Sequence, residues 1–181
     1  MALLRSWRGE PVSADQVNDS TFRVWPHDLD AFGHMNNGRY LQIMDVSRAQ
    51  WMAKTGVLTA MRQHRWSAVL GGNITRYRRS LKPFQSYSVQ TSLVCWDDKW
   101  FFFKHLFIDK QNRCVAIGLS RAALRTACGW VDSHLVVGQV QPGAQSPAMP
   151  EYFKAWVSAE DIMYREAQSA QETGDIARSF A

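Results

Sequence analysis

Apolar residues follow a helical spacing early in the chain and a strand-like spacing later. Residues 36–54 carry apolar side chains at intervals of three and four, spread over a broad arc, which is typical of a helix buried on most of its sides. They include Tyr40, Leu41, Ile43, Met44, Val46, Trp51 and Met52. Asn36 or Asn37 can cap the start of this helix, and Gly56 can end it.

After Trp66 the spacing changes to period two. Within residues 86–95 the apolar side chains stand at odd positions and serine or glutamine at even ones, as in a half-buried antiparallel strand. Turn-forming residues separate four such runs, at about 67–80, 84–96, 100–109 and 113–125. We expect these four strands to form an antiparallel meander.

The flanking segments add a strand before the helix and a helix near the end. Residues 21–25 look like a short strand that Pro26 ends, and residues 141–150, with three prolines, look like an irregular connector. A short amphipathic helix is expected after it, with Ser158 and Asp161 as a capping box inside that helix or at a second start. The predicted fold class is therefore α+β, a curved antiparallel sheet around one long helix.

Length and composition indicate one globular domain. The chain has 181 residues, 46% of them hydrophobic, which is ordinary for a single compact core. Eight Trp and nine Phe suit a buried core and also a buried subunit interface. The formal charge of +5 suits an anionic partner, whether nucleic acid, a membrane surface or a nucleotide-bearing small molecule, but it also fits a basic soluble protein without such a partner.

Cysteine usage indicates a reducing compartment. Cys95, Cys114 and Cys128 are odd in number and form no CxxC pair, which argues against a disulfide framework and a zinc site. Residues 1–4 are apolar but Arg5 follows, so this run is too short for a signal sequence or a membrane span. We expect a cytoplasmic protein without a membrane span.

Polar groups crowd into residues 27–40, HDLDAFGHMNNGRY, where a strand leads into the buried helix. A simple turn would need only Gly33 and one asparagine, whereas this segment places two carboxylates, two imidazoles and two amides beside apolar elements. Free N–H groups at the helix start can hold an oxygen that becomes negative during acyl transfer. Asp30 can attack a thioester carbonyl or deprotonate the water that does so.

The pattern DLDAFGHMNNGRY at residues 28–40 resembles the opening motif of hotdog-fold acyl-CoA and acyl-carrier-protein thioesterases, the 4-hydroxybenzoyl-CoA thioesterase-like group. The segments VWP (24–26), YRRSL (77–81) and WDD (96–98) resemble the branch called thioesterase superfamily member six. The resemblance extends to about residue 125. It implies an N-terminal extension (1–20), a hotdog domain (21–126) and a C-terminal extension with the short helix (127–181).

The resemblance also implies roles for individual residues. The second acid of the D-x-D pair is the catalytic carboxylate in such enzymes, which is Asp30 here, and the amide N–H near Asn37 polarises the thioester carbonyl. Plant acyl-carrier-protein thioesterases also use the histidine of a similar run, here His34. Because members of this group place each active site at a subunit interface, a homodimer or a dimer of dimers is expected. No metal or redox cofactor is implied.

Each of these residues also has a structural explanation. Asp30 can cap the following turn, and His34 can be a hydrogen-bonded histidine near the helix start. One asparagine is enough for the cap, so the other of Asn36 and Asn37 is free to bind substrate or hold Asp30. Tyr40 fits a pocket wall or a core ring better than a proton donor.

Four further groups carry predictions. Asp28 is expected to orient the loop, and Asp45 and Arg48 are expected to form a structural ion pair. A basic cluster fits either the phosphates of coenzyme A or a charged strand edge that discourages aggregation, and it lacks the features of a nucleic-acid site. It consists of Arg76, Arg78, Arg79 and Lys82. The apolar run at 100–103 can line an acyl pocket or simply fill the sheet core.

The sequence therefore predicts an enzyme that hydrolyses an acyl-CoA or acyl-carrier-protein thioester to an acid and a thiol. A hotdog protein that binds acyl thioesters without turnover is an alternative. A hotdog dehydratase acting on 3-hydroxyacyl thioesters is a second one, which the D-x-D-x-x-G-H run disfavours.

Overall fold

The computed structural model describes residues 13–173, which divide into two compact units with the boundary in the sequence between Pro147 and Ala148. The strands are β1 (Asn18–Arg23), β2 (Ser67–Tyr77), β3 (Ser86–Trp96), β4 (Phe101–Asp109), β5 (Cys114–Thr126) and β6 (Gly129–Val131). The helices of the first unit are η1 (Pro26–Asp28), α1 (Asn37–Thr55), α2 (Val57–His64) and α3 (Ser133–Val140). The second unit contains α4 (Glu151–Thr173).

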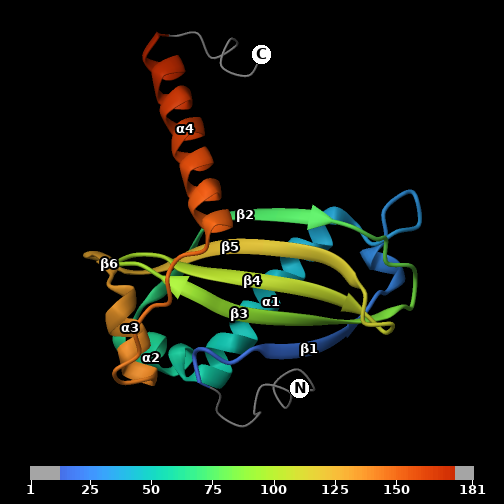
Figure 1. Ribbon diagram of the computed structural model, residues 1–181, viewed down its shortest axis with the longest axis horizontal. Coiled ribbons are helices and arrows are strands. Elements are labelled where there is room, and N and C mark those ends of the chain that lie inside the picture. Colours follow the sequence, from blue (N-terminus) through green and yellow to red (C-terminus); the bar gives the residue numbers. More distant parts are fainter. Residues whose placement is uncertain (1–12, 174–181) are drawn as a thin grey trace. The chain divides into compact units, whose positions relative to one another are not determined.

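The strands form one antiparallel sheet in the order β1-β3-β4-β5-β2, with β6 paired to β5 (Figure 1). The predicted strand positions are confirmed within a few residues, and β3, β4 and β5 form a meander. The predicted meander is wrong for β2, which pairs with β5 from Ser67↔Arg125 to Tyr77↔Ala116. Alternating side chains identify a strand and its buried face, but they do not distinguish one neighbouring strand from another.

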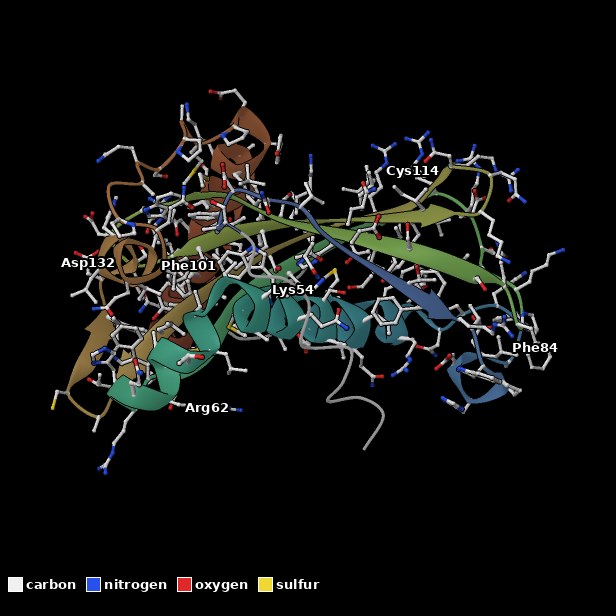
Figure 2. The ribbon with its side chains drawn as sticks, turned by 90° about the horizontal axis from the view of Figure 1, so that it is seen from below. Lys54, Arg62, Phe84, Phe101, Cys114 and Asp132 are labelled. Atoms are coloured by element: carbon white, nitrogen blue, oxygen red, sulfur yellow. The ribbon has the colours of Figure 1, made fainter. Side chains whose placement is uncertain are left out.

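The long helix α1 lies along one face of the sheet, which curves over it (Figure 2). Its buried side chains include Tyr40, Met44 and Trp51, which confirms the predicted broad apolar arc. A Cβ at Gly118 would lie only 2.1 Å from Met44 Sδ, so the helix packs directly against the backbone of β5. The predicted cap is also confirmed, because Asn36 Oδ1 accepts a hydrogen bond from Gly38 N at 2.8 Å. The helix ends at Gly56, whose φ of +86° suits glycine.

A chain of polar side chains crosses the core between α1 and the sheet. His105, fully buried, contacts Thr91 Oγ1 through Nδ1 and Ser120 Oγ through Nε2, each at 2.9 Å. Arg48 Nη1 donates to the same Ser120 Oγ at 2.9 Å, and Arg48 forms the predicted ion pair with Asp45. Burial, and then the charge of Arg48, lower the pKa of His105 to about 3, so this imidazole is neutral at ordinary pH.

The short elements and the C-terminal helix differ most from the prediction. The eight-residue helix α2 before β2, and the strand β6 and the eight-residue helix α3 after β5, were not expected, because such short elements show little periodicity. The helix α4 begins at Glu151 but continues to Thr173, so the expectation of a short helix is wrong in length. Ser158 and Asp161 lie inside α4 and mark no second helix start.

Candidate functional site

A small hairpin brings Asp30 to the start of α1. Leu29 and Met35 form a β-bridge, the backbone N–H of Asp30 donates to His34 O at 2.8 Å, and Asn36 N donates to Asp28 O at 2.8 Å. Gly33 completes the turn with a φ of +74°, which glycine adopts without steric cost. The crowded polar segment is therefore an ordered loop whose two arms meet just before the first helical turn.

Asp28 anchors this loop from inside the protein. Its carboxylate, only 3% exposed, accepts a hydrogen bond from Trp25 N at 2.7 Å and pairs with Arg39 Nε at 2.7 Å. Because Arg39 belongs to the first turn of α1, the ion pair joins the loop to the helix start. These contacts agree with the predicted loop-orienting role of Asp28. His27 Nε2 lies 3.3 Å from the same carboxylate and is mostly exposed.

Asp30 has one oxygen bound and one available. Its Oδ1 accepts hydrogen bonds from Phe32 N at 2.9 Å and His34 N at 3.1 Å. Asp30 therefore caps the turn, which is the structural role that the sequence also allowed. Among residues 13–173, no hydrogen-bond partner is found for Oδ2. Two N–H donors on one oxygen fix the orientation of the carboxylate and leave the other oxygen for a ligand.

Asp30 lines a pocket of about 250 Å³ at the start of α1. The pocket brings together six of the predicted site residues: Asp30, His34, Asn37, Tyr40, Arg78 and Arg79. Met35, Tyr77 and Ser80 complete its wall. Asn36, Arg76 and Lys82 do not line it, and their predicted contacts with substrate stay predictions.

The start of α1 offers one unused backbone donor. Gly38 N donates to Asn36 Oδ1, and Arg39 N donates to Asn36 O. Within the described part of the chain, no acceptor is found for the N–H of Asn37. This N–H carries the positive end of the helix dipole, and Asn37 lines the same pocket as Asp30. The pocket therefore combines a fixed carboxylate with a hydrogen-bond donor suited to a developing oxyanion.

Two tyrosines form the inner wall of the pocket. The rings of Tyr40 and Tyr77 pack edge to face with centroids 5.1 Å apart, and Tyr77 Oη donates to Asn37 O at 3.2 Å. Burial raises the pKa of Tyr40 to about 12 and also raises that of Tyr77, so both phenols keep their protons at neutral pH. Sequence reasoning missed Tyr77 as a site residue. Strand alternation turns Tyr77 of β2 toward α1, but it does not show that β2 crosses the sheet to lie beside this pocket.

The basic cluster divides between two faces. Arg78 and Arg79 follow β2 and line the pocket, and Arg79 Nη1 is held by Cys114 O at 2.8 Å. Arg76 precedes Tyr77 in β2 and therefore points to the opposite face of the sheet. Lys82 lies in the next turn, where its backbone N–H donates to Gln85 Oε1. Two of the four cationic side chains are thus at the pocket.

A second pocket, of about 230 Å³, lies farther along α1. Its walls come from α1, α2, β2, β4 and β5 and are mainly apolar, with Trp51, Phe101 and Phe103 as the large rings. The ion pair between the buried Arg48 and the exposed Asp45 lies on its border. Phe101 and Phe103 line this pocket and also belong to the buried core, so the acyl-pocket and the sheet-core interpretation of this run both stay predictions. We call this the distal pocket.

Within the described residues, no three His, Cys, Asp or Glu side chains are grouped so that they could bind a metal ion. No helix in the same part of the chain is long and apolar enough to cross a membrane.

Comparison with known proteins gives consistent matches. The model of the thioesterase-like superfamily matches residues 24–157. Protein THEM6 of Xenopus laevis is 33% identical over 157 residues, which are 85% of this chain and 74% of that protein. Protein THEM6 of Drosophila melanogaster is 36% identical over 137 residues, 75% of this chain and 69% of the relative.

Solved structures share the fold at low sequence identity. The probable thioesterase YbaW of Escherichia coli superposes with a TM-score of 0.63 at 16% identity, covering 68% of this chain and 96% of that one. The Staphylococcus aureus protein SAV2348, solved in complex with CoA, superposes with a TM-score of 0.57 at 14% identity, covering 83% and 87%. The observed sheet curved over α1 is thus the hotdog fold.

Proposed function

This chain belongs to the thioesterase-like superfamily and is a thioester hydrolase, and from that premise we propose that it hydrolyses acyl-CoA thioesters in the pocket of Asp30 and Asn37. The observation that carries the proposal is the shared pocket itself. A carboxylate with one free oxygen and an unused helix-start N–H line the same hollow. Hydrolysis of a thioester needs these two functions, a base or nucleophile and an oxyanion donor.

In the proposed reaction, the thioester carbonyl oxygen accepts a hydrogen bond from Asn37 N–H. Asp30 removes a proton from a water molecule, and the resulting hydroxide attacks the carbonyl carbon. The tetrahedral intermediate then collapses, breaks the C–S bond and releases the acid and the thiol, with the proton on Asp30 passing to the leaving sulfur. His34, on the pocket wall, is proposed to orient the water.

A covalent route uses the same carboxylate. In that route, Asp30 attacks the carbonyl, expels the thiolate and forms a mixed anhydride, which water then hydrolyses. Single-turnover reaction in ¹⁸O-labelled water distinguishes the routes, because only the covalent route leaves label in the carboxylate of Asp30.

Arginine at the pocket supports coenzyme A as the carrier. The guanidinium groups of Arg78 and Arg79 offer forked donors that match phosphate oxygens. A structural neighbour with the same fold was solved in complex with CoA. An acyl carrier protein presents its thioester on a phosphopantetheine arm and is the second candidate carrier.

We propose that the distal pocket takes the end of the acyl chain. α1 runs past both pockets, since Asn37 lines the first and Arg48 and Trp51 line the second. The separation along the helix from Asn37 to Arg48 is about 16 Å at 1.5 Å per residue. The proposed substrate therefore has a long acyl chain rather than a short one.

We also propose a homodimer formed through β2. This eleven-residue strand is an edge of the sheet, and Leu70 and Ile74 on it are 43% and 46% exposed. Exposed apolar edge strands promote association, and a second copy of the chain would extend the sheet and border the pocket beside Tyr77.

A panel of acyl-CoA esters from short to long chains, with thiol release as the readout, tests the proposed function. We expect turnover by the wild-type protein, a large loss for Asp30→Ala, and no loss for Asp98→Ala, which removes a fully exposed carboxylate. Tight binding of acyl-CoA without thiol release would favour the non-catalytic binder. Hydration of an enoyl thioester without hydrolysis would favour the dehydratase.

A further inference from the structure

Three turns of the first unit lie side by side at one end of the sheet. β1 ends where β3 begins, with Arg23 opposite Ser86. The turn between β4 and β5 lies at the same end, because Tyr87 stands opposite Asp109. Figure 2 shows this end at the right, with Phe84 and Cys114 labelled. Tyr77 at the end of β2 stands opposite Ala116 near the start of β5, so the pocket of Asp30 belongs to the same end.

This end exposes a pair of aromatic side chains. Trp25 is 48% exposed and Phe84 58% exposed, and their rings pack edge to face with centroids 6.3 Å apart. Backbone hydrogen bonds hold the two turns together, from Phe84 N to Val24 O at 2.8 Å and from Val24 N to Gln85 O at 3.0 Å. The aromatic pair is therefore fixed in position on ordered backbone.

The backbone at Phe84 makes this exposure costly. Its φ is +60°, a conformation that suits Gly or Asn and is unfavourable for a bulky residue. Gly or Asn at this position would fold with less backbone strain. A strained and solvent-exposed Phe is explained if its ring contacts something outside the chain.

The charge at this end is positive. Arg23, Lys82 and Lys110 are exposed there, and Arg78 and Arg79 lie at the pocket. The two buried carboxylates are already paired, Asp28 with Arg39 and Asp109 with Arg113, and Asp30 in the pocket adds one negative charge against these five positive ones. The net electrostatic field at this end is therefore positive and favours binding to an anionic surface.

We propose that this end of the sheet docks on an anionic lipid bilayer, with Trp25 and Phe84 in the interfacial layer and Arg23, Lys82 and Lys110 over lipid phosphates. Trp is favoured at the lipid–water interface because its ring is apolar and its N–H is polar. Apolar insertion together with basic residues gives the two signals that stable peripheral binding needs. An acidic protein would be attracted by the charge alone and would have less use for an exposed aromatic pair.

If the proposed function is correct, docking would place the pocket near the bilayer surface, where long-chain acyl thioesters concentrate. The docking itself does not depend on hydrolysis. Membrane binding and turnover can therefore be measured separately.

The test is co-sedimentation of the full chain with phosphatidylcholine vesicles, with and without phosphatidylserine. We expect binding only to the vesicles that contain phosphatidylserine, weakened by high salt. The double variant Trp25→Ser/Phe84→Asn should partition at least about tenfold less, since burial of even one aromatic ring contributes more than 1.4 kcal/mol. Asn tolerates the φ of residue 84, and the Trp25 backbone N–H that binds Asp28 is kept.

Trp130→Ser is the matched control, because Trp130 is 50% exposed on β6, at the opposite end of β5. It should bind vesicles as the wild type does.

Absence of binding to phosphatidylserine vesicles, or equal binding by the double variant, would overturn the proposal. Binding to an acidic acyl carrier protein but not to vesicles would overturn it in favour of a protein partner. Hydrolysis of a short, soluble acyl-CoA without vesicles should be equal in the double variant and the wild type. If no acyl-CoA is hydrolysed while vesicle binding persists, only the proposed function fails.

Discussion

At the scale of single residues, the loop before α1 depends on the ion pair between Asp28 and Arg39. Asp28 is almost completely buried and joins the loop to the first helical turn through Arg39 Nε at 2.7 Å. Removal of one partner leaves a buried charge without compensation. The ion pair therefore controls both stability and the placement of Asp30 against Asn37 N–H.

Replacement of Arg39 by Gln should lower the free energy of unfolding by about 3 kcal/mol. It should also reduce kcat more than it raises KM for acyl-CoA, because a displaced loop disturbs the reacting groups. Denaturant unfolding and steady-state kinetics measure the two effects. Asp28→Asn/Arg39→Gln, which removes both charges, should recover part of the stability. If the double variant is less stable than either single one, the ion pair does not have this role.

The sequence predicted most of the residues that line the candidate pocket, because the loop, the helix cap and the carboxylates are close together in the chain. Asp30, His34, Asn37 and Tyr40 occur within eleven residues and need only a hairpin and a helix start to meet. Tyr77 was missed because it reaches the pocket from β2 through the folded sheet. Its position depends on the crossing of β2 to the far edge, which strand periodicity does not encode.

At the scale of elements, α1 and the sheet are joined by the polar chain through His105. The lowered pKa of this imidazole has a defined consequence for stability. In the unfolded chain the imidazole of His105 binds a proton near pH 6.5, whereas in the folded chain it does so only near pH 3. The contribution of neutral His105 to the free energy of unfolding is therefore present above pH 6.5. It is lost as the pH falls toward 3, by up to about 1.4 kcal/mol per pH unit.

Urea unfolding between pH 8 and pH 4 tests this consequence. His105→Gln should be less stable than the wild type at pH 8, and the difference should shrink as the pH falls below 6.5. His134→Gln, at a half-exposed histidine, should keep the wild-type slope. An unchanged slope in His105→Gln would show that another group governs the acid response.

The distal pocket is also formed by whole elements, because two helices and three strands make its walls. Ala68 lines it from β2 and is exposed enough to accept a larger side chain. Ala68→Phe should shift the preferred acyl chain to shorter lengths and reduce kcat/KM for the longest esters about tenfold, with little effect on the shortest. An equal loss for all chain lengths would contradict the assigned role of the distal pocket.

At the scale of the whole molecule, the open edge at β2 is the proposed subunit interface. Ile74→Lys should weaken dimerisation at least about tenfold, because a two-fold axis brings the introduced charges near each other. Sedimentation velocity measures the dimer population. Ile162→Lys, at an exposed position on α4, is the control and should leave it unchanged. A monomeric wild-type protein with full activity would contradict the interface.

The most direct measurement of the central claim is the turnover of Asp30→Asn on the best acyl-CoA of the panel. Asparagine keeps an oxygen for the N–H groups of Phe32 and His34, so the loop and the melting temperature should be preserved. Loss of the negative charge removes the base or nucleophile, and kcat should fall by about 10² to 10⁴. A variant that retains the wild-type kcat would show that Asp30 only holds the turn.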